Sequence, residues 1–239
     1  MGLTVFAYVG IDYFYWCQSW HKYKLFALWC LRGHCVDMLI DLHVHSTMSQ
    51  CSTLLPEDII SKARTSGLDG VCITDHDTTA VLSQIVEGFQ SDGLLVIVGM
   101  EYTTPQGDFL VFGDLKSLSK GMSAVELLAA VQQRGGAAVA AHPFRGWRPT
   151  DVAIIESSSC AAIEVENGRN TDYENLLASE FAAKCNILGV AGSDAHNLAE
   201  LGRFPTRFTV PIKDRNDLVR ALNMGQCEPS SVSPVLAAS

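Results

Sequence analysis

The stretch Ile40-Asp41-Leu42-His43-Val44-His45-Ser46 reads as a short buried strand that ends in two histidines one residue apart. Because side chains at positions i and i+2 of a strand point to the same face, His43 and His45 can direct their imidazoles toward one point. Neutral imidazole is a common metal ligand. A single pair of this kind often occurs by chance, so the prediction of a metal site depends on further ligands after other strands.

Segments with strand and helix character alternate through residues 38–228. The expected strands cover residues 39–45, 70–74, 94–98, 109–112, 137–141, 161–165, 187–191 and 207–210. The expected helices cover residues 56–67, 123–134, 171–184 and 214–223, with a short helix after Pro149 and one from Thr78 or Thr79 to residue 90. About seven such units predict a parallel α/β barrel that is closed or nearly closed. An open doubly wound sheet is the alternative, and it would gather ligands at a single switch point.

Ligand-type side chains follow most of the expected strands. They are His43, His45, Asp75, His76, Glu101, His142, Asp194 and His196. Five of the seven histidines are among them, a concentration that scattered surface histidines would not produce. Chemistry in parallel barrels takes place at the carboxyl ends of the strands. The sequence therefore predicts a metal site at the C-terminal ends of the strands.

Five motifs carry a resemblance to a known family. They are Asp41-Leu42-His43-Val44-His45-Ser46, Thr74-Asp75-His76-Asp77, Gly99-Met100-Glu101, Ala141-His142-Pro143-Phe144-Arg145 and Gly192-Ser193-Asp194-Ala195-His196. With these motifs in order over residues 40–210, the sequence resembles the polymerase and histidinol phosphatase family, usually called the PHP domain. The resemblance implies a distorted seven-stranded (β/α)7 TIM-like barrel, two or three divalent metal ions and hydrolysis of phosphate esters.

The resemblance also implies a role for individual residues. The implied ligands are His43, His45, Glu101 and Asp194 for a first metal; Glu101 as a bridge, His142 and Asp108 for a second; and His76 and His196 for a third. Mixed imidazole and carboxylate ligands favour Mn, Zn or Fe over Mg and Ca, which prefer oxygen ligands alone. Two ions that share Glu101 would lie roughly 3.5–4 Å apart, and a water between them could attack phosphorus.

The sequence departs from the family at Gln50, where many members carry Asp. Glutamine is a weaker, neutral ligand, so the third metal position lacks its usual carboxylate. Cys51 could act there as a thiolate, which would favour zinc. For Cys51, the sequence favours the interpretation of a buried thiol in a loop.

The expected catalytic residues are Glu101, His196, Arg145 and Arg169. Arg145 and Arg169 directly follow strand-end motifs, and a guanidinium suits bidentate contact with phosphate. A salt-bridged or solvated loop arginine is an equally expected interpretation of each. His196 or His76 could protonate the leaving oxygen if its metal is absent.

For several neighbouring polar and aromatic residues, the position in the sequence does not decide between two roles. Asp75 is expected to orient a ligand histidine rather than to bind metal. One of Glu164 and Glu166 could face the cavity, and a salt-bridge role is equally expected. Trp147 is expected to anchor its loop, with stacking on a base or a sugar ring as the alternative.

Composition limits the partners and the compartment. The formal net charge of -9 argues against a broad surface for long nucleic acid. Eight cysteines occur without CxxC pairs, and Cys72 and Cys160 lie in apolar runs, which indicates a reducing, cytoplasmic compartment. Without a run of eighteen apolar residues, no transmembrane helix and no membrane partner are expected. The expected partner is a phosphorylated small molecule or nucleotide, and the oligomeric state stays open.

Residues 1–37 differ from the rest of the chain. They hold ten of the twenty aromatic residues and three of the four tryptophans, without a helix or strand period. Met38 stands directly before the first strand, so we expect it to be the natural start and residues 1–37 to lie outside the fold. An aromatic-rich appendage that packs on the barrel or on a partner is the alternative. The PHP-like domain would then cover 38–228, with a frayed tail at 229–239.

These observations predict a metal-dependent phosphoesterase that hydrolyses a phosphate monoester or diester of a small metabolite or nucleotide through a metal-bridging water. A non-catalytic, metal-binding PHP-like module is one alternative, which Gln50 and Asp108 favour. A nuclease for short oligonucleotides is another. Metal-dependent amide or lactone hydrolysis on a similar barrel is a third. Such barrels often use a carbamylated lysine as the bridge, and no lysine stands at an expected strand end here.

Overall fold

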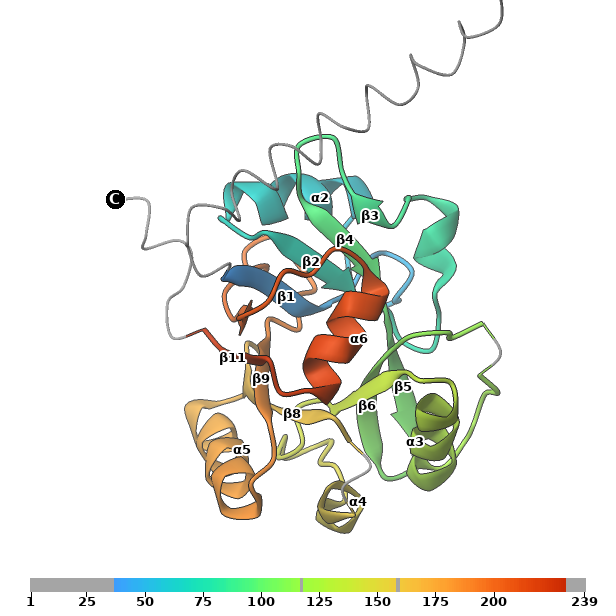
Figure 1. Ribbon diagram of the computed structural model, residues 1–239, viewed down its shortest axis with the longest axis vertical. Helices are drawn as coiled ribbons and strands as arrows, with labels where there is room; N and C mark the ends of the chain where they lie inside the picture. Colours follow the sequence, from blue (N-terminus) through green and yellow to red (C-terminus); the bar gives the residue numbers. More distant parts are fainter. Residues whose placement is uncertain (1–36, 117, 158–159, 231–239) are drawn as a thin grey trace, which may run out of the picture. The chain divides into compact units, whose positions relative to one another are not determined.

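The computed structural model describes residues 37–116, 118–157 and 160–230, and their strands form two sheets (Figure 1). The first sheet has the order β11-β10-β1-β2-β4-β3, with β1 (Met38–Val44), β2 (Gly70–Ile73), β3 (Gly88–Phe89), β4 (Leu95–Val98), β10 (Thr206–Phe208) and β11 (Cys227–Pro229). The second sheet has the order β5-β6-β7-β8-β9, with β5 (Met100–Thr104), β6 (Gly107–Phe112), β7 (Ala137–Ala140), β8 (Ala162–Asn167) and β9 (Gly189–Gly192).

The strand pairing corrects the expectation of a closed, parallel seven-stranded barrel. Only β1–β2, β2–β4, β7–β8 and β8–β9 pair in parallel among the described strands. β5 and β6 are antiparallel because two residues, Pro105 and Gln106, connect them, and a parallel pair needs a much longer crossover. The two sheets are linked by the isolated bridges Val44–Ala195 and His76–Glu101 and are not one closed sheet. The fold is therefore mixed α/β with two sheets, and the single doubly wound sheet is not observed either.

Most of the expected helices form with the start signals that the sequence carries. They are α2 (Pro56–Thr65), α3 (Ala124–Gln133), α4 (Val152–Glu156), α5 (Asp172–Cys185) and α6 (Arg215–Asn223). Ser123 and Thr171 each form a capping box, with Glu126 and Glu174 respectively, at the start of α3 and α5. The helix expected from Thr78 or Thr79 to residue 90 is wrong: a 3-10 turn, η1 (Ala80–Ser83), precedes β3, and Gly88 adopts a φ of 114° that no helix contains.

Two hydrophobic clusters stabilise the two sheets. One packs α2 against the first sheet, where Ile59 and Ala63 contact buried strand residues such as Val71 and Val96. The other packs α3 and α5 against the second sheet around Phe109. Figure 1 shows α2 beside β2 and β4, and α3 and α5 beside the second sheet. Each large apolar side chain buried in this way contributes about 1.5–3 kcal/mol. The clusters leave the C-terminal ends of β1, β2, β7, β8 and β9 to polar residues.

The ends of the chain lie largely outside the described residues. The predicted leader is described only at Asp37, and the positions of His21 and His34 are not described. β11 ends at Pro229, the residue at which the frayed tail was predicted to begin. In the described part of the chain, no helix has the length and apolar character needed to cross a membrane.

Candidate metal centre

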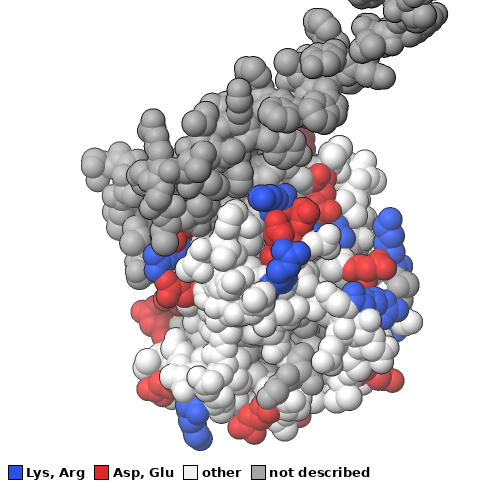
Figure 2. Space-filling view, viewed as in Figure 1, with Lys and Arg blue, Asp and Glu red and all other residues white. Residues whose placement is uncertain are grey.

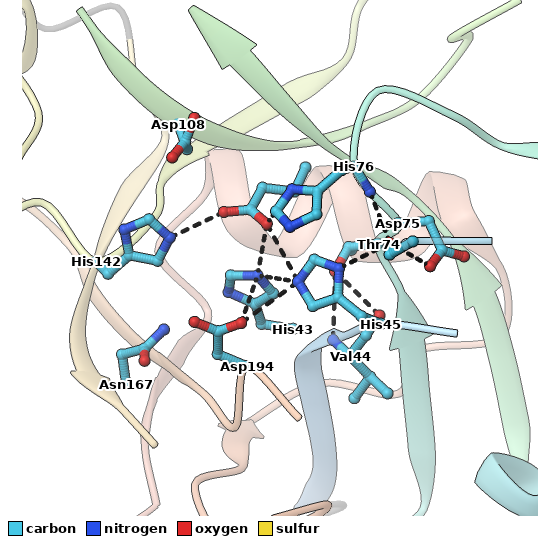
Figure 3. Close-up of polar contacts among 12 residues, drawn as sticks. His43, Val44, His45, Thr74, Asp75, His76, Asp108, His142, Asn167 and Asp194 are labelled. Atoms are coloured by element: carbon cyan, nitrogen blue, oxygen red, sulfur yellow. Dashed lines mark hydrogen bonds and ion pairs between the residues drawn. The ribbon is translucent and has the colours of Figure 1, made fainter. Parts of the chain in front are cut away.

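The predicted metal ligands gather where the strands of the two sheets end. His43 is on β1 and His45 follows it, His76 follows β2, Glu101 is on β5, Asp108 is on β6, His142 follows β7, and Asp194 and His196 follow β9. Figure 3 shows the imidazoles of His43, His45 and His76 and the carboxylate of Asp194 turned toward a common centre. Residues that are up to 153 positions apart in sequence, from His43 to His196, are thus brought into one cluster.

Four of these side chains place one ligand atom each close to the two histidine nitrogens at the centre of the cluster. His43 Nε2 and His45 Nε2 lie 3.0 Å apart, and Glu101 Oε2 is 3.3 and 3.1 Å from them. Asp194 Oδ1 is 3.6 and 3.3 Å from the same two nitrogens. Ligand atoms this close to one another can share one ion, because zinc binds nitrogen and oxygen ligands at about 2.0–2.2 Å.

The hydrogen bonds behind the two histidines set their tautomers. His43 Nδ1 donates to Glu164 Oε1 at 2.9 Å, because a carboxylate oxygen only accepts. Asp75 accepts from Ser49 Oγ at 2.7 Å, so Ser49 offers a lone pair to His45 Nδ1 at 3.1 Å. When the two rings are neutral, Nδ1 therefore carries the proton and Nε2 directs a lone pair to the centre. Asp75 thus contacts a ligand histidine through Ser49, in agreement with the orienting role expected for it.

The central carboxylate atom has no hydrogen-bond donor. Glu101 is 1% exposed, and Oε2 has no hydrogen-bond partner among the described residues, although three imidazole nitrogens lie 3.0–3.3 Å away. Lone pairs that converge on one buried point without protons between them repel each other and are stabilised by a cation. The residues therefore fit a divalent metal ion. Glu101 Oε1, which lies 2.8 Å from His142 Nε2, faces away from this point, as a bridging carboxylate requires.

The charges of the cluster shift its titration in the direction expected for a cation site. Burial lowers the pKa of His43, but the charges of Asp194, Glu164 and Glu101 outweigh burial and raise it well above its ordinary value. Burial raises the pKa of Glu101, but His43 and the hydrogen bond with His142 hold it well below its usual range. The net effect is a buried concentration of negative charge that favours positive charge at its centre.

The second expected metal position contains a competing arginine. One ligand atom each from Glu101, Asp108 and His142 lie within 4.8 Å of one another. Arg148 donates to both carboxylate oxygens of Asp108, at 2.7 and 2.9 Å. Asp108 is thus near the predicted metal but is paired with a guanidinium. The sequence interpretation missed Arg148, although its position six residues after His142 in the same loop was a usable signal.

The third expected position consists of imidazoles and a thiol. Ligand atoms of His45, His76 and His196 lie within 4.8 Å of one another. His196 Nδ1 donates to the Asp194 carbonyl at 2.8 Å, and Nε2 lies 3.1 Å from Cys51 Sγ. Burial, with the neighbouring charge of His45, lowers the pKa of His196 to about 4, so the ring is neutral near pH 7. Cys51 is exposed and lines the pocket, which corrects the interpretation of a buried loop thiol.

Glu164 is a further site residue whose role the sequence left open. It is fully buried, and its Oε2 accepts from the His142 amide at 2.7 Å and from Asn167 Nδ2 at 2.9 Å. Together with the contact from Oε1 to His43, one carboxylate orients two of the predicted ligands. Glu166, the other candidate, is half-buried, and burial raises its pKa.

The predicted arginines have different environments. Arg145 is 6% exposed and donates through Nη2 to Asp194 Oδ2 at 2.7 Å and to Asn167 at 2.8 Å, so its geometry is that of the salt-bridge alternative. Arg169 is exposed and lines the pocket. The pocket, of about 470 Å³, lies over the ligand cluster and also includes Arg148.

Trp147 is 79% exposed at the edge of the same pocket, which corrects the expectation that it anchors its loop. The guanidinium carbon of Arg145 lies 5.4 Å from the centre of the Trp147 ring. The indole therefore keeps most of its surface available to a ligand.

Two of the ligand residues have unusual backbone conformations. His142 and Asp194 have φ angles of 32° and 52°, and only Asp77 and Asn186 share this feature among the described residues other than glycine. Positive φ is unfavourable for residues with a Cβ and is concentrated at functional sites. In Asp194 this conformation accompanies the contacts of its two carboxylate oxygens with the histidine pair and with Arg145.

The fold and the cluster define an α/β protein with buried His, Glu and Asp side chains that are able to bind a divalent metal. A family model described as PHP domain matches residues 41–196, and one described as PHP-associated matches residues 172–227. The chain belongs to the PHP domain family, a family of metal-dependent phosphoesterases, as the resemblance of its motifs implied.

Two curated proteins are similar to this chain in sequence. An uncharacterized protein of Methanocaldococcus jannaschii is 29% identical over 180 residues, which are 72% of this chain and 71% of that protein. A phosphoribosyl 1,2-cyclic phosphate 1,2-diphosphodiesterase of Eggerthella lenta is 41% identical over 64 residues, which are 27% of this chain and 24% of that enzyme.

Solved structures share the fold at low sequence identity. PsfC from Pseudomonas syringae superposes with a TM-score of 0.65 at 21% identity, over 84% of this chain and 95% of that one. The lesion-specific endonuclease Q from Pyrococcus furiosus gives 0.61 at 18% identity, over 81% of this chain and 58% of that one. These similarities establish the fold but not the substrate. The substrate class has to be argued from the residues of the site.

Proposed function

We propose that this chain hydrolyses a phosphate monoester or diester of a small metabolite or nucleotide, with two or three divalent ions of Mn, Zn or Fe. The observation that carries the proposal is the buried Glu101 Oε2, which has no hydrogen-bond partner and lies within 3.0–3.3 Å of three imidazole nitrogens. Ions held there would acidify a bridging water and neutralise charge on the phosphoryl oxygens.

The ligands are assigned in this proposal by the groups that the geometry forms. The first ion would be held by His43, His45, Glu101 and Asp194; the second by Glu101, His142 and Asp108; and the third by His76 and His196. For Asp108 to bind an ion, one of its oxygens must be shared with or released by Arg148. Because Glu101 belongs to both the first and the second group of ligands, its carboxylate would hold these two groups next to each other.

Arginines would bind the substrate rather than the metals. Arg169 is exposed at the pocket and can contact a phosphoryl group directly, and Arg148 can turn to it if Asp108 binds an ion. Arg145 would act as a positioning residue, because its guanidinium is bound to Asp194. Of the two histidines considered as proton donors, His76 has a side chain that is 39% exposed. His196, neutral near pH 7, suits a ligand better.

The substrate class is argued from the size of the pocket and from the charges on one face of the molecule. A pocket of about 470 Å³ has room for a nucleotide or a sugar phosphate. The face drawn in Figure 2 carries acidic and basic residues side by side, without a continuous basic patch among the described residues of that face. The neighbouring endonuclease Q has been solved with a duplex that contains an abasic lesion, so the expectation of no long nucleic acid needs a direct test. We also propose a cytoplasmic location, which the free thiols of five described cysteines support.

The test is a hydrolysis screen with the full chain, loaded with Mn or Zn. Phosphorylated metabolites, nucleotides, dinucleotides and a duplex with an abasic site are compared, with phosphate release or strand cleavage as the readout. Turnover of a small ester that disappears in Glu101→Gln supports the proposal. Bound metal without turnover of any phosphate substrate favours the non-catalytic module, and turnover of the duplex alone favours the nuclease. Turnover of an amide or a lactone in place of the phosphate esters would assign the site to the third alternative.

A further inference from the structure

We propose that Cys51 is a thiolate ligand at the third metal position and makes this position selective for zinc. The inference rests on the proposed metal centre and concerns residues in which this chain departs from its family. Gln50 stands where many members carry a ligand carboxylate, and the adjacent residue is the one that reaches the site. The pocket lining includes Cys51 and does not include Gln50.

The sulfur lies beside His196, one member of the imidazole group. Cys51 Sγ is 3.1 Å from His196 Nε2. Because His196 Nδ1 donates its proton to the Asp194 carbonyl, Nε2 carries the lone pair that faces the sulfur. Two potential ligand atoms at this separation can share one ion, since Zn–S and Zn–N bonds of about 2.3 and 2.0 Å allow such a distance.

The buried carboxylate beside the imidazole group points to a cation nearby. The unpartnered and buried Glu101 Oε2 lies 3.0 Å from His76 Nδ1. His76 in turn belongs to the group of ligand atoms with His45 and His196. The thiol therefore stands next to a cluster that lacks protons between its lone pairs and is not an isolated cysteine.

The loop that carries Cys51 is attached to both sides of the site. Ser52 Oγ donates to the His45 carbonyl at 2.7 Å, and the Thr53 amide donates to the His196 carbonyl at 3.2 Å. The Ser52 amide also donates to the Ser49 carbonyl at 3.0 Å, which closes a tight turn around Cys51. These bonds hold the thiol in place before any ion binds, so little conformational entropy is lost on coordination.

The chemistry of a thiolate differs from that of the carboxylate that it would replace. Coordination releases the thiol proton to solvent, and no other bond changes. Thiolate is a soft ligand that favours zinc, whereas carboxylates also suit Mn and Mg. A zinc-selective third position beside a site of imidazoles and carboxylates would allow two different metals to bind the same chain.

Cobalt spectroscopy tests the assignment without relying on turnover. The full chain and Cys51→Ser are stripped of metal and loaded with equal amounts of Co²⁺. We expect the parent to show a near-ultraviolet sulfur-to-cobalt band that is missing from Cys51→Ser, which also retains one equivalent of metal fewer. Difference spectra remove any contribution from the other cysteines. The matched controls Gln50→Ala and Cys185→Ser should keep both the band and the metal.

A measurement on the unaltered chain keeps the test independent of variants. Alkylation by iodoacetamide, mapped by peptide mass, should modify Cys51 in the metal-free protein and be blocked by Zn²⁺ but not by Mg²⁺. If Zn²⁺ leaves alkylation unchanged and Cys51→Ser keeps the cobalt band, the thiol is only a hydrogen-bond partner of His196. Phosphoesterase activity in that protein would still support the proposed function, whereas a chain that binds no metal at all would contradict both proposals.

Discussion

Glu101 connects all the predicted metal positions through one carboxylate. Its Oε2 lies within 3.3 Å of His43, His45 and His76, and its Oε1 lies 2.8 Å from His142. Glu101 Oε2 is buried without a hydrogen-bond donor. A buried negative charge of this kind is costly unless a cation compensates it. The site therefore depends more strongly on this residue than on any single histidine.

Replacing Glu101 by Gln should remove the paired metals and nearly all phosphoesterase activity. The amide keeps the shape but lacks the charge, and its NH2 group would point at one of the surrounding nitrogens. We expect more than about 100-fold loss in turnover, beyond the effect of residues that only orient ligands. Metal content by emission spectrometry and ester hydrolysis measure the result. Glu166→Gln, on the same sheet, is the control, and full metal content with retained turnover in Glu101→Gln would contradict the bridging role.

The contacts of Glu164 predict a weaker but distinct effect. It accepts from both His43 Nδ1 and the His142 amide, and an amide oxygen in Glu164→Gln can satisfy only one of them. We expect metal affinity to fall by about 10–100-fold, the range found for residues that orient ligands. Titration against a chelator of known affinity gives the constant. Unchanged affinity, with the same thermal stability as the parent, would show that His43 is oriented by other contacts.

At the scale of elements, the sequence predicted most of the strands and the candidate ligand residues that follow them. The motifs after β1, β2, β7 and β9 are local, since each depends on a short alternating run and the residues that follow it. The antiparallel pairing of β5 and β6 was missed because Met100-Glu101 was interpreted only as a strand end. The helix to residue 90 was predicted wrongly because the positive φ of Gly88 has no local signal other than glycine itself.

The contacts that complete the site were not predictable from local patterns. Arg148 and Asp108 are 40 residues apart, and His43 and Glu164 are 121 residues apart. No spacing rule links residues across two sheets. The exposure of Cys51 likewise depends on the turn at 49–54, which hydrogen bonds to the carbonyls of His45 and His196 determine.

Close packing between β9 and β1 predicts that Gly192 accepts no side chain. A Cβ at this position would lie 2.5 Å from Glu164 Oε1 and 2.6 Å from the Cβ of His43. Gly192→Ala should therefore destabilise the protein by about 1–3 kcal/mol through overpacking and weaken metal binding. Urea denaturation measures the first effect and metal titration the second. Gly146→Ala, whose Cβ would meet its nearest atom at 3.5 Å, is the control that should change neither.

At the scale of the whole domain, the predicted metal site lies where the two sheets meet. His43 and His45 come from the first sheet, and Glu101 and His142 from the second. Apart from helix and side-chain packing, the sheets are linked by isolated bridges at these same strand ends. An ion bound there would therefore stabilise the arrangement of the two sheets as well as the loops around it.

Metal removal should consequently lower the thermal stability in a pH-dependent way. An ion at 100 times its dissociation constant contributes about 2.7 kcal/mol. In the metal-free protein the raised pKa of His43 stabilises the fold fully below its unfolded value of about 6.5, and this contribution is lost as pH rises through the folded pKa. Metal binding follows the opposite trend, because protons compete with the ion for the imidazoles.

The difference in Tm between the metal-loaded and the metal-free protein should therefore widen as pH rises above about 6.5. Calorimetry of both forms at several pH values, with chelator present throughout in the metal-free series, measures it. Glu101→Gln is the control, since it should show little difference between the two series at any pH. A difference in Tm that stays constant over this range would mean that His43 is not protonated in the metal-free cluster. The negative charge around Glu101 would then be compensated by another group.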